Sequence, residues 1–355
     1  MTEVLRVDAE TPDPAVVEHA ASVLRAGGTV AFPTETVYGV GATALDASAV
    51  RRVFEAKGRP PEDPLIVHLA AEDGVHLVAR DVLAIAHTLV RRFWPGPLTL
   101  VLPRRPEVPA EVTAGLDTVA VRMPAHHVAL AMIEAARAPV AAPSANRFGR
   151  ASPTTAQHVL DDLEGRIDLV LDAGPTSVGL ESTVLDLTRE VPTILRPGGV
   201  AREEIERVVG MVEVSGSTAG PAPSPGMLES HYAVAPELVV VECPDARATP
   251  EVLAEMTSLA RRYGAAGRGV AIAAASDDVL GPDAEVSRLG SSKDLDEVAH
   301  NLFAVLRSLE AGGAEVIVSR SFGEAGLGLA IGDRLRRAAA QIVVPSQRPR
   351  GPEST

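Results

Sequence analysis

The sequence predicts an α/β protein with two domains. Strand-like and helix-like segments alternate along almost the whole chain, a pattern typical of sheets covered by helices. The length of 355 residues exceeds the usual size of one domain. Residues 215–236 hold four Pro, three Gly and four Ser, a composition that indicates an interdomain linker. We therefore expect domains over residues 1–214 and 237–346 and a C-terminal tail over 347–355. The linker between the domains either packs on its neighbour or forms a strap over a functional site.

The N-terminal domain opens with two helices that have clear start and stop signals. Asp13 and Pro14 supply a cap and a first-turn proline for a helix that ends at Gly27. After a strand, a second helix begins at Asp46 and ends at Gly58. The later strands are expected at Leu65–Leu69, Leu98–Leu102, Val119–Met123, Val140–Ala142, Leu169–Asp172, Thr183–Leu187 and Thr193–Leu195, with helices near 81–93, 125–137 and 154–164.

The C-terminal domain repeats a regular strand and helix alternation, which predicts a small doubly wound sheet. Its segments are expected at Leu238–Glu242 (strand), Pro250–Tyr263 (helix), Val270–Ala274 (strand), Leu295–Leu309 (helix), Glu315–Ser319 (strand) and about 331–340 (helix).

Composition and charge exclude several classes of protein. Cys243 is the only cysteine, which excludes an internal disulfide and paired-cysteine metal sites. The net charge is −14, and residues 1–210 carry 20 basic against 28 acidic side chains, which disfavours a nucleic-acid-wrapping protein. The first ten residues do not resemble a secretory signal, and no run of about 18 apolar residues occurs. We therefore expect a cytoplasmic protein with no membrane partner.

Common catalytic signatures are missing, so the candidate residues are polar side chains on apolar strands. There is no Walker loop, no nucleophile elbow and no histidine cluster with metal spacing. Strand alternation places Thr118 and Arg122 on one face, opposite Val119 and Val121. In the segment 65–69 it places Ile66 and His68 on the face opposite the apolar side chains. Arg122 is either a ligand-binding guanidinium or part of an ion pair at a strand end. His68 is either a ligand or a strand histidine bonded to a backbone carbonyl.

Three loops and one helix end offer further binding groups. The loops 33–39, 143–146 and 181–183 combine small hydroxyls with backbone N–H donors that suit a carboxylate or phosphate, although each is also consistent with an ordinary turn. Lys57 and Arg59 lie at the end of the second helix. They either bind phosphate or complement the helix dipole.

Seven segments in this order resemble one enzyme family, the YrdC-type threonylcarbamoyl-AMP synthases. The segments are FPTETVYGVGA (32–42), FEAKGRPPEDPLIVHLA (54–70), FWPGPLTLVL (93–102), VAVRMP (119–124), APSANRFGRASPT (142–154), ESTVLDL (181–187) and ILRPGG (194–199). The linker motif SPGMLESHYAVAP and the following region resemble the longer, two-domain form. The resemblance implies a twisted mixed sheet domain of YrdC type followed by a smaller Rossmann-like α/β domain.

The resemblance also implies a reaction. L-threonine, bicarbonate and ATP, with Mg²⁺ as cofactor, give threonylcarbamoyl-adenylate and pyrophosphate for threonylcarbamoyladenosine modification of tRNA. The product would pass to a separate tRNA threonylcarbamoyl transferase, and stable direct tRNA binding is not expected. The alternative is an RNA-binding or ribosome-maturation protein of the same fold, which the acidic first domain and the 3% aromatic content disfavour.

The family pattern maps onto individual residues of this chain. L-threonine would contact Thr36, His68, Arg122, Ala142 and Ser182. ATP would contact Lys57, Arg59, Asp63, Thr118, Ser144, Asn146, Ser152, Arg196 and Tyr232, with Lys57 and Arg59 also catalytic. Asp63 departs from the asparagine of the family pattern, and a carboxylate there would repel phosphates unless it binds Mg²⁺ or pairs with Arg59.

Overall fold

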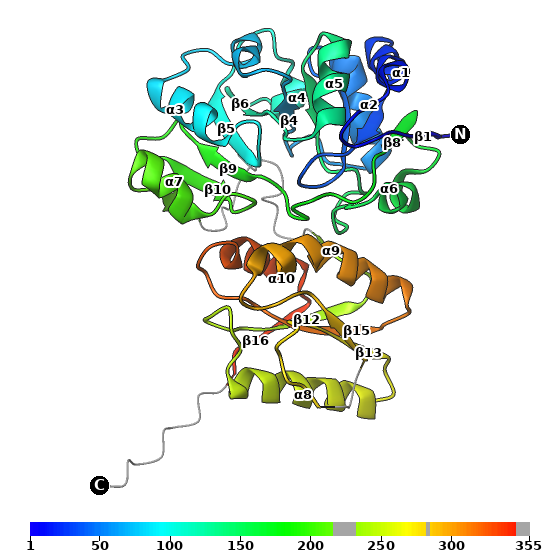
Figure 1. Cartoon of the computed structure of the whole chain (residues 1–355), viewed down its shortest axis with the longest axis vertical. Helices are drawn as coiled ribbons and strands as arrows, with labels where there is room; N and C mark the ends of the chain where they lie inside the picture. The colour runs from blue at the N-terminus through cyan, green and yellow to red at the C-terminus, as the bar shows by residue number, and fades with distance from the viewer. Residues whose placement is uncertain (216–231, 282–284, 346–355) are drawn as a thin grey trace. The chain divides into compact units, whose positions relative to one another are not determined.

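The structure is a computed structural model that describes residues 1–215, 232–281 and 285–345 (Figure 1). It separates into two compact units, Met1–Tyr232 and Ala233–Thr355, and the division falls inside the segment expected to be a linker. Most of that segment, residues 216–231, lies outside the described residues, as does the expected tail over 347–355. No helix in the described ranges is both long enough and apolar enough to cross a membrane.

The first unit is built on an eleven-stranded mixed sheet with the order β1-β8-β2-β3-β7-β4-β6-β5-β9-β10-β11. Its strands are β1 (Glu3–Arg6), β2 (Val30–Phe32), β3 (Gly39–Thr43), β4 (Ile66–His68), β5 (Leu98–Pro103), β6 (Thr118–Arg122), β7 (Val140–Ala142), β8 (Leu169–Asp172), β9 (Thr183–Asp186), β10 (Thr193–Arg196) and β11 (Glu213–Val214). Its helices are α1 (Pro14–Arg25), α2 (Ala47–Lys57), η1 (Glu72–Leu77), α3 (Ala84–Phe93), α4 (Ala110–Thr113), α5 (His127–Ala136), α6 (Ala156–Leu163) and α7 (Arg202–Val209).

The predicted helix signals act as expected at α1 and α2. Asp13 accepts a hydrogen bond from Ala15 N at the start of α1, and Asp46 accepts from Ser48 N and Ala49 N at the start of α2. Gly58 ends α2 with φ 65°, a left-handed conformation that favours glycine. In the first unit, the strands β1, β3 and β11 and the helices η1, α4 and α7 were not among the predicted elements. In the second unit, the strands β14 (Glu285–Arg288) and β16 (Gln341–Val343) were not predicted.

Helices cover both faces of the sheet in the first unit. Apolar residues of α1 and α5 pack together on one face against β2, β7 and β8, and Figure 1 shows these two helices side by side. Residues of α2 and α6 pack on the other face. A small cluster, which includes Ile66, Ala120 and Val184, lies between β4, β5, β6, β9 and β10. Ile66 is also part of the pocket described below.

The second unit is a parallel five-stranded sheet with the order β14-β13-β15-β12-β16. Its elements are β12 (Glu237–Val241), α8 (Pro250–Ala265), β13 (Val270–Ala274), β14 (Glu285–Arg288), α9 (Leu295–Ala311), β15 (Val316–Arg320), α10 (Gly328–Ala338) and β16 (Gln341–Val343). Within this unit, α8 covers one face of the sheet, and α9 and α10 cover the other (Figure 1). The predicted fold class, a mixed sheet domain followed by a smaller Rossmann-like domain, is confirmed.

Candidate functional site

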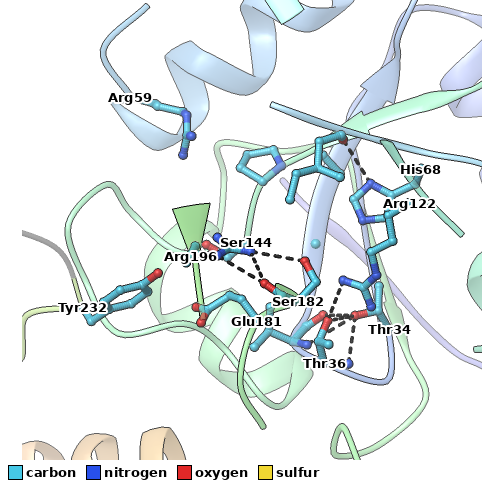
Figure 2. A pocket seen from close by; sticks show the side chains of 15 residues that line it. Thr34, Thr36, Arg59, His68, Arg122, Ser144, Glu181, Ser182, Arg196 and Tyr232 are labelled. Carbon is cyan, nitrogen blue, oxygen red and sulfur yellow. Dashed lines mark hydrogen bonds between the residues drawn. The ribbon is translucent and has the colours of Figure 1, made fainter. Parts of the chain in front are cut away.

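A polar pocket lies in the first unit. Figure 2 shows the side chains that line it. The lining residues are Thr34, Thr36, Val37, Gly39, Arg59, Ile66, His68, Arg122, Ala142, Pro143, Ser144, Glu181, Ser182, Arg196 and Tyr232. Each of the three loops that the sequence singled out contributes to this set.

Strand register places the candidate side chains next to one another. β4 and β6 are parallel, with Ile66 opposite Ala120 and His68 opposite Arg122. Because paired residues on neighbouring strands project from the same face, the imidazole and the guanidinium share one side of the sheet. Ala142 of β7 pairs with Ile66 from the other side. Residues from three chain segments thus form one wall of the pocket.

His68 is buried at this wall and carries no charge near neutral pH. Burial, and then the positive charge of Arg122, lower the pKa of His68 from 6.5 to about 3. Its Nδ1 lies 3.1 Å from the carbonyl oxygen of Ile66, which accepts a hydrogen bond from the ring in the tautomer that is protonated at Nδ1. His68 therefore contacts a backbone carbonyl, as one of the two interpretations expected. Its ring also lines the pocket.

Arg122 is held by three groups. Its Nη1 donates to Thr36 Oγ1 (2.9 Å), its Nε donates to Gly96 O (3.3 Å), and its Nη2 lies 2.6 Å from Glu35 Oε2. Both charged side chains are buried. Arg122 therefore forms the ion pair that was considered for it, although the sequence did not identify Glu35 as the partner. Thr34 extends the chain of contacts, since its hydroxyl lies 2.8 Å from that of Thr36.

Ser182 and Arg196 form a second polar group at the pocket. Arg196 Nη2 donates to Ser182 O (2.9 Å) and to Ser182 Oγ (3.2 Å). The turn after Arg196 packs tightly against this segment, because a Cβ on Gly198 would lie 2.3 Å from Glu181 O. Glycine is required there for steric reasons, which explains the Gly198 of the ILRPGG motif.

Arg59 lines the pocket, whereas Asp63 lies behind it. Arg59 Nη2 and Asp63 Oδ2 are 2.9 Å apart in a fully buried ion pair. Burial lowers the pKa of Arg59, and the charge of Asp63 opposes this shift. An aspartate at position 63 was expected either to bind Mg²⁺ or to pair with Arg59. The structure contains the pairing with Arg59.

Lys57 also lies outside the pocket lining. It is 2% exposed, and its Nζ donates to Ser144 O (2.6 Å) and to Asn146 O. Ser144 Oγ in turn donates to Asn146 Oδ1 (2.5 Å). Lys57 and Asn146 therefore hold the loop that presents Ser144 to the pocket.

Of the remaining predicted residues, some line the pocket and others lie outside its lining. Thr118, at the start of β6, and Ser152 are not in the described set that lines the pocket. Ser152 Oγ donates to Glu181 Oε1 and so stands behind a lining residue. Tyr232 lines the pocket with φ 67°. The interpretation of the linker 215–236 as a strap over the site falls mainly outside the described residues.

Sequence reasoning did not assign several lining residues. Thr34, Val37, Gly39, Pro143 and Glu181 belong to the loops that were singled out, but no role was given to them. The signal that was available for Glu181 is its carboxylate, an unusual group in a loop proposed to bind anions. Over the described ranges, no cluster of three or more His, Cys, Asp or Glu side chains is arranged to hold a metal ion.

Two family models match successive parts of the chain. The model described as "Telomere recombination", for Sua5, YciO and YrdC proteins, matches residues 22–198. The model described as "Threonylcarbamoyl-AMP synthase, C-terminal domain" matches residues 200–340.

Full-length relatives and a solved structure are similar over nearly the whole chain. The threonylcarbamoyl-AMP synthase of Pyrococcus abyssi is 46% identical, over 92% of this chain and 94% of the relative. That of Bacillus subtilis is 43% identical, over 94% and 95%. The crystal structure of P. abyssi Sua5 complexed with L-threonine superposes with a TM-score of 0.91 at 44% identity, covering 97% of this chain and 99% of that one.

Proposed function

The chain belongs to the family of two-domain threonylcarbamoyl-AMP synthases, and from this premise we propose how its pocket makes threonylcarbamoyl-adenylate. The enzyme is an L-threonylcarbamoyladenylate synthase, a nucleotidyltransferase that acts in tRNA modification, with L-threonine and ATP as substrates. One observation carries the proposal: a single pocket contains Arg122 beside His68 and Thr36 together with Arg59, Arg196 and Ser144.

The first group of residues is suited to an amino acid. A guanidinium binds a carboxylate through paired N–H donors, and Arg122 is positioned for this by Thr36 and Glu35. Neutral His68 next to it adds no second cation and leaves the substrate amine free of charge repulsion. In this proposal Arg122 binds the threonine carboxylate, and Thr36, His68, Ala142 and Ser182 orient the rest of the molecule.

The second group of residues is suited to a triphosphate. Arg59 and Arg196 supply positive charge, and Ser144 supplies a hydroxyl donor. Both guanidinium groups are buried, so their interaction with phosphate is screened little by water. Tyr232 lines the same region and offers a ring surface for the nucleotide.

The chemistry proceeds in two displacements. The threonine ammonium first loses a proton to solvent. The neutral amine nitrogen then forms a bond to the carbon of bicarbonate, the carbon–hydroxyl bond breaks, the hydroxyl leaves as water with a proton from the nitrogen, and a carbamate results. A carbamate oxygen then forms a bond to the α-phosphorus of ATP while the bond to the β-phosphate oxygen breaks and pyrophosphate departs. Negative charge increases on the departing phosphates, where Arg59 and Arg196 stabilise it; a fixed charge of this kind is often worth about 3 kcal/mol. No covalent enzyme intermediate is needed.

Three further expectations complete the proposal. Bicarbonate is the source of the carbonyl carbon, ATP enters with Mg²⁺, and the adenylate passes to a separate tRNA threonylcarbamoyl transferase. The alternative of an RNA-binding or ribosome-maturation protein is not favoured, since the full-length relatives are named as synthases.

One assay tests the proposed reaction. Purified protein is incubated with ATP, Mg²⁺, L-threonine and labelled bicarbonate, and the label is sought in an adenylate. We expect pyrophosphate release to require both threonine and bicarbonate. Release of pyrophosphate with either one omitted, or label that never enters an adenylate, contradicts the proposal.

A further inference from the structure

Glu181 contributes a negative charge to a pocket that is otherwise cationic. Three guanidinium groups line the pocket, from Arg59, Arg122 and Arg196, and Glu181 is the one carboxylate among the described lining residues. Its side chain lies among the pocket residues in Figure 2 and is 6% exposed. The proposed function gives Arg59, Arg122 and Arg196 anionic groups to bind, but it gives Glu181 no role.

The backbone and side chain of Glu181 are fixed in position. Its carbonyl oxygen accepts from Gly199 N (3.0 Å), and the close approach of Gly198 holds the same peptide. Its Oε1 accepts a hydrogen bond from Ser152 Oγ. The carboxylate therefore stands at a defined point of the pocket, beside Ser182 and Tyr232, and is not a mobile surface group.

A fixed carboxylate next to a triphosphate is unfavourable unless a cation lies between them, because like charges repel strongly in a buried site. Mg²⁺ takes only oxygen ligands and commonly uses one or two carboxylates together with substrate phosphates and water. Glu181 fits that preference, because it offers carboxylate oxygens within the pocket that is proposed to hold the phosphates. When bound, Mg²⁺ neutralises phosphate charge and orients the leaving pyrophosphate.

We propose that Glu181 is the protein carboxylate that binds the Mg²⁺ accompanying ATP. The inference rests on the proposed function, which places ATP in this pocket. One carboxylate binds Mg²⁺ only weakly when no phosphate is present. In this proposal the metal therefore binds together with the nucleotide. The competing interpretation is that Glu181 has a structural role only, through contacts within the chain such as the one with Ser152.

Nucleotide affinity with and without metal separates the two interpretations. The probe is α,β-methylene-ATP, which cannot donate its adenylyl group because a carbon replaces the α–β bridging oxygen. It is titrated by calorimetry in Mg²⁺ or in EDTA. We expect Mg²⁺ to tighten binding to the unmodified chain and Glu181→Gln to reduce this tightening by about tenfold or more. In EDTA the same variant should bind at least as tightly as the unmodified chain, because one repulsive charge is gone. Glu190→Gln, an exposed change on the β9–β10 connection, is the matched control and should alter neither value.

The outcomes decide the matter. If Glu181→Gln weakens binding equally in Mg²⁺ and in EDTA, or changes neither, Glu181 is not the metal ligand. Should the variant fail to fold, the unmodified chain supplies the answer: with carboxyl-¹³C glutamate incorporated and Mn²⁺ bound together with the analogue, electron–nuclear double resonance is expected to show ¹³C coupling to the metal. Absence of that coupling overturns the proposal. Because the analogue is not turned over, failure of the adenylation assay would be a separate result.

Discussion

The Arg122 guanidinium and the Glu35 carboxylate form a buried ion pair, with Nη2 and Oε2 2.6 Å apart and side chains 4% and 7% exposed. The pair restricts the guanidinium before any ligand arrives, which suits the proposed binding of a substrate carboxylate by Arg122. The Glu35 carboxylate also compensates the positive charge of the buried Arg122 guanidinium. Under the proposed function, Glu35 would therefore act through Arg122 as a positioning residue.

Glu35→Ala should destabilise the first unit substantially. Removing one partner of a buried pair leaves the other charge without compensation, at a cost of about 3–5 kcal/mol. The free energy of unfolding in urea measures this cost. Glu190→Ala removes the same charge at an exposed position and should change stability by less than about 0.5 kcal/mol. A loss below about 1 kcal/mol for Glu35→Ala would show that the pair contributes little.

Arg122→Ala should raise the threonine requirement far more than the ATP requirement. A lost charge-assisted contact to a carboxylate costs about 2 kcal/mol or more, which corresponds to roughly a 30-fold increase in the threonine KM. Arg122→Lys keeps the charge without the planar fork, so an intermediate increase is expected. Steady-state kinetics with each substrate varied in turn provide the measurement. Equal increases for the two substrates would contradict the assignment of Arg122 to threonine.

Local signals in the sequence were sufficient to predict the helix ends and to predict which side chains of two strands share a face. Asp13, Asp46 and Gly58 mark the helix ends through contacts with residues at most a few positions away. The period of two along β4 and β6 predicted which side chains share a face. That His68 and Arg122 lie opposite each other depends on the pairing register, which no local pattern specifies.

Contacts between distant segments account for what the sequence did not reveal. Lys57 donates to carbonyl oxygens 87 and 89 positions away in the chain. The sequence around Lys57 could therefore not show whether this lysine binds phosphate or supports a loop. Glu35 is likewise brought to Arg122 only by the sheet. The short strand β11 is too brief to show a period, and its two exposed residues carry no burial signal.

His68 should make the stability of the first unit depend on pH between about 7 and 3. Its pKa is about 3 in the folded chain and 6.5 in the unfolded chain, because burial and Arg122 disfavour the imidazolium. The unfolded state therefore binds more protons in this window, and stability is complete above pH 6.5 and falls as the pH is lowered towards 3. Between pH 6.5 and pH 5 this one group contributes a loss of about 2 kcal/mol.

Urea unfolding of His68→Asn at several pH values tests this dependence. The variant should show a shallower fall in unfolding free energy below pH 6.5 than the unmodified chain, whatever its absolute stability. His127→Asn alters a side chain that is 64% exposed and should leave the slope unchanged. Parallel slopes for His68→Asn and the unmodified chain would contradict the assigned origin of the pH dependence.

Lys57→Met should lower both stability and turnover, because the ammonium supports the loop that carries Ser144. Methionine has a similar length but no donor, so the carbonyl groups of Ser144 and Asn146 lose a hydrogen bond in a buried place, at about 1–3 kcal/mol each. A looser loop misplaces Ser144, so we expect the initial rate of pyrophosphate release at saturating substrates to fall. Lys293→Met replaces the only other lysine, which is exposed, and serves as the control. If Lys57→Met lost turnover at unchanged stability, the lysine would act on the substrate directly and not through the loop.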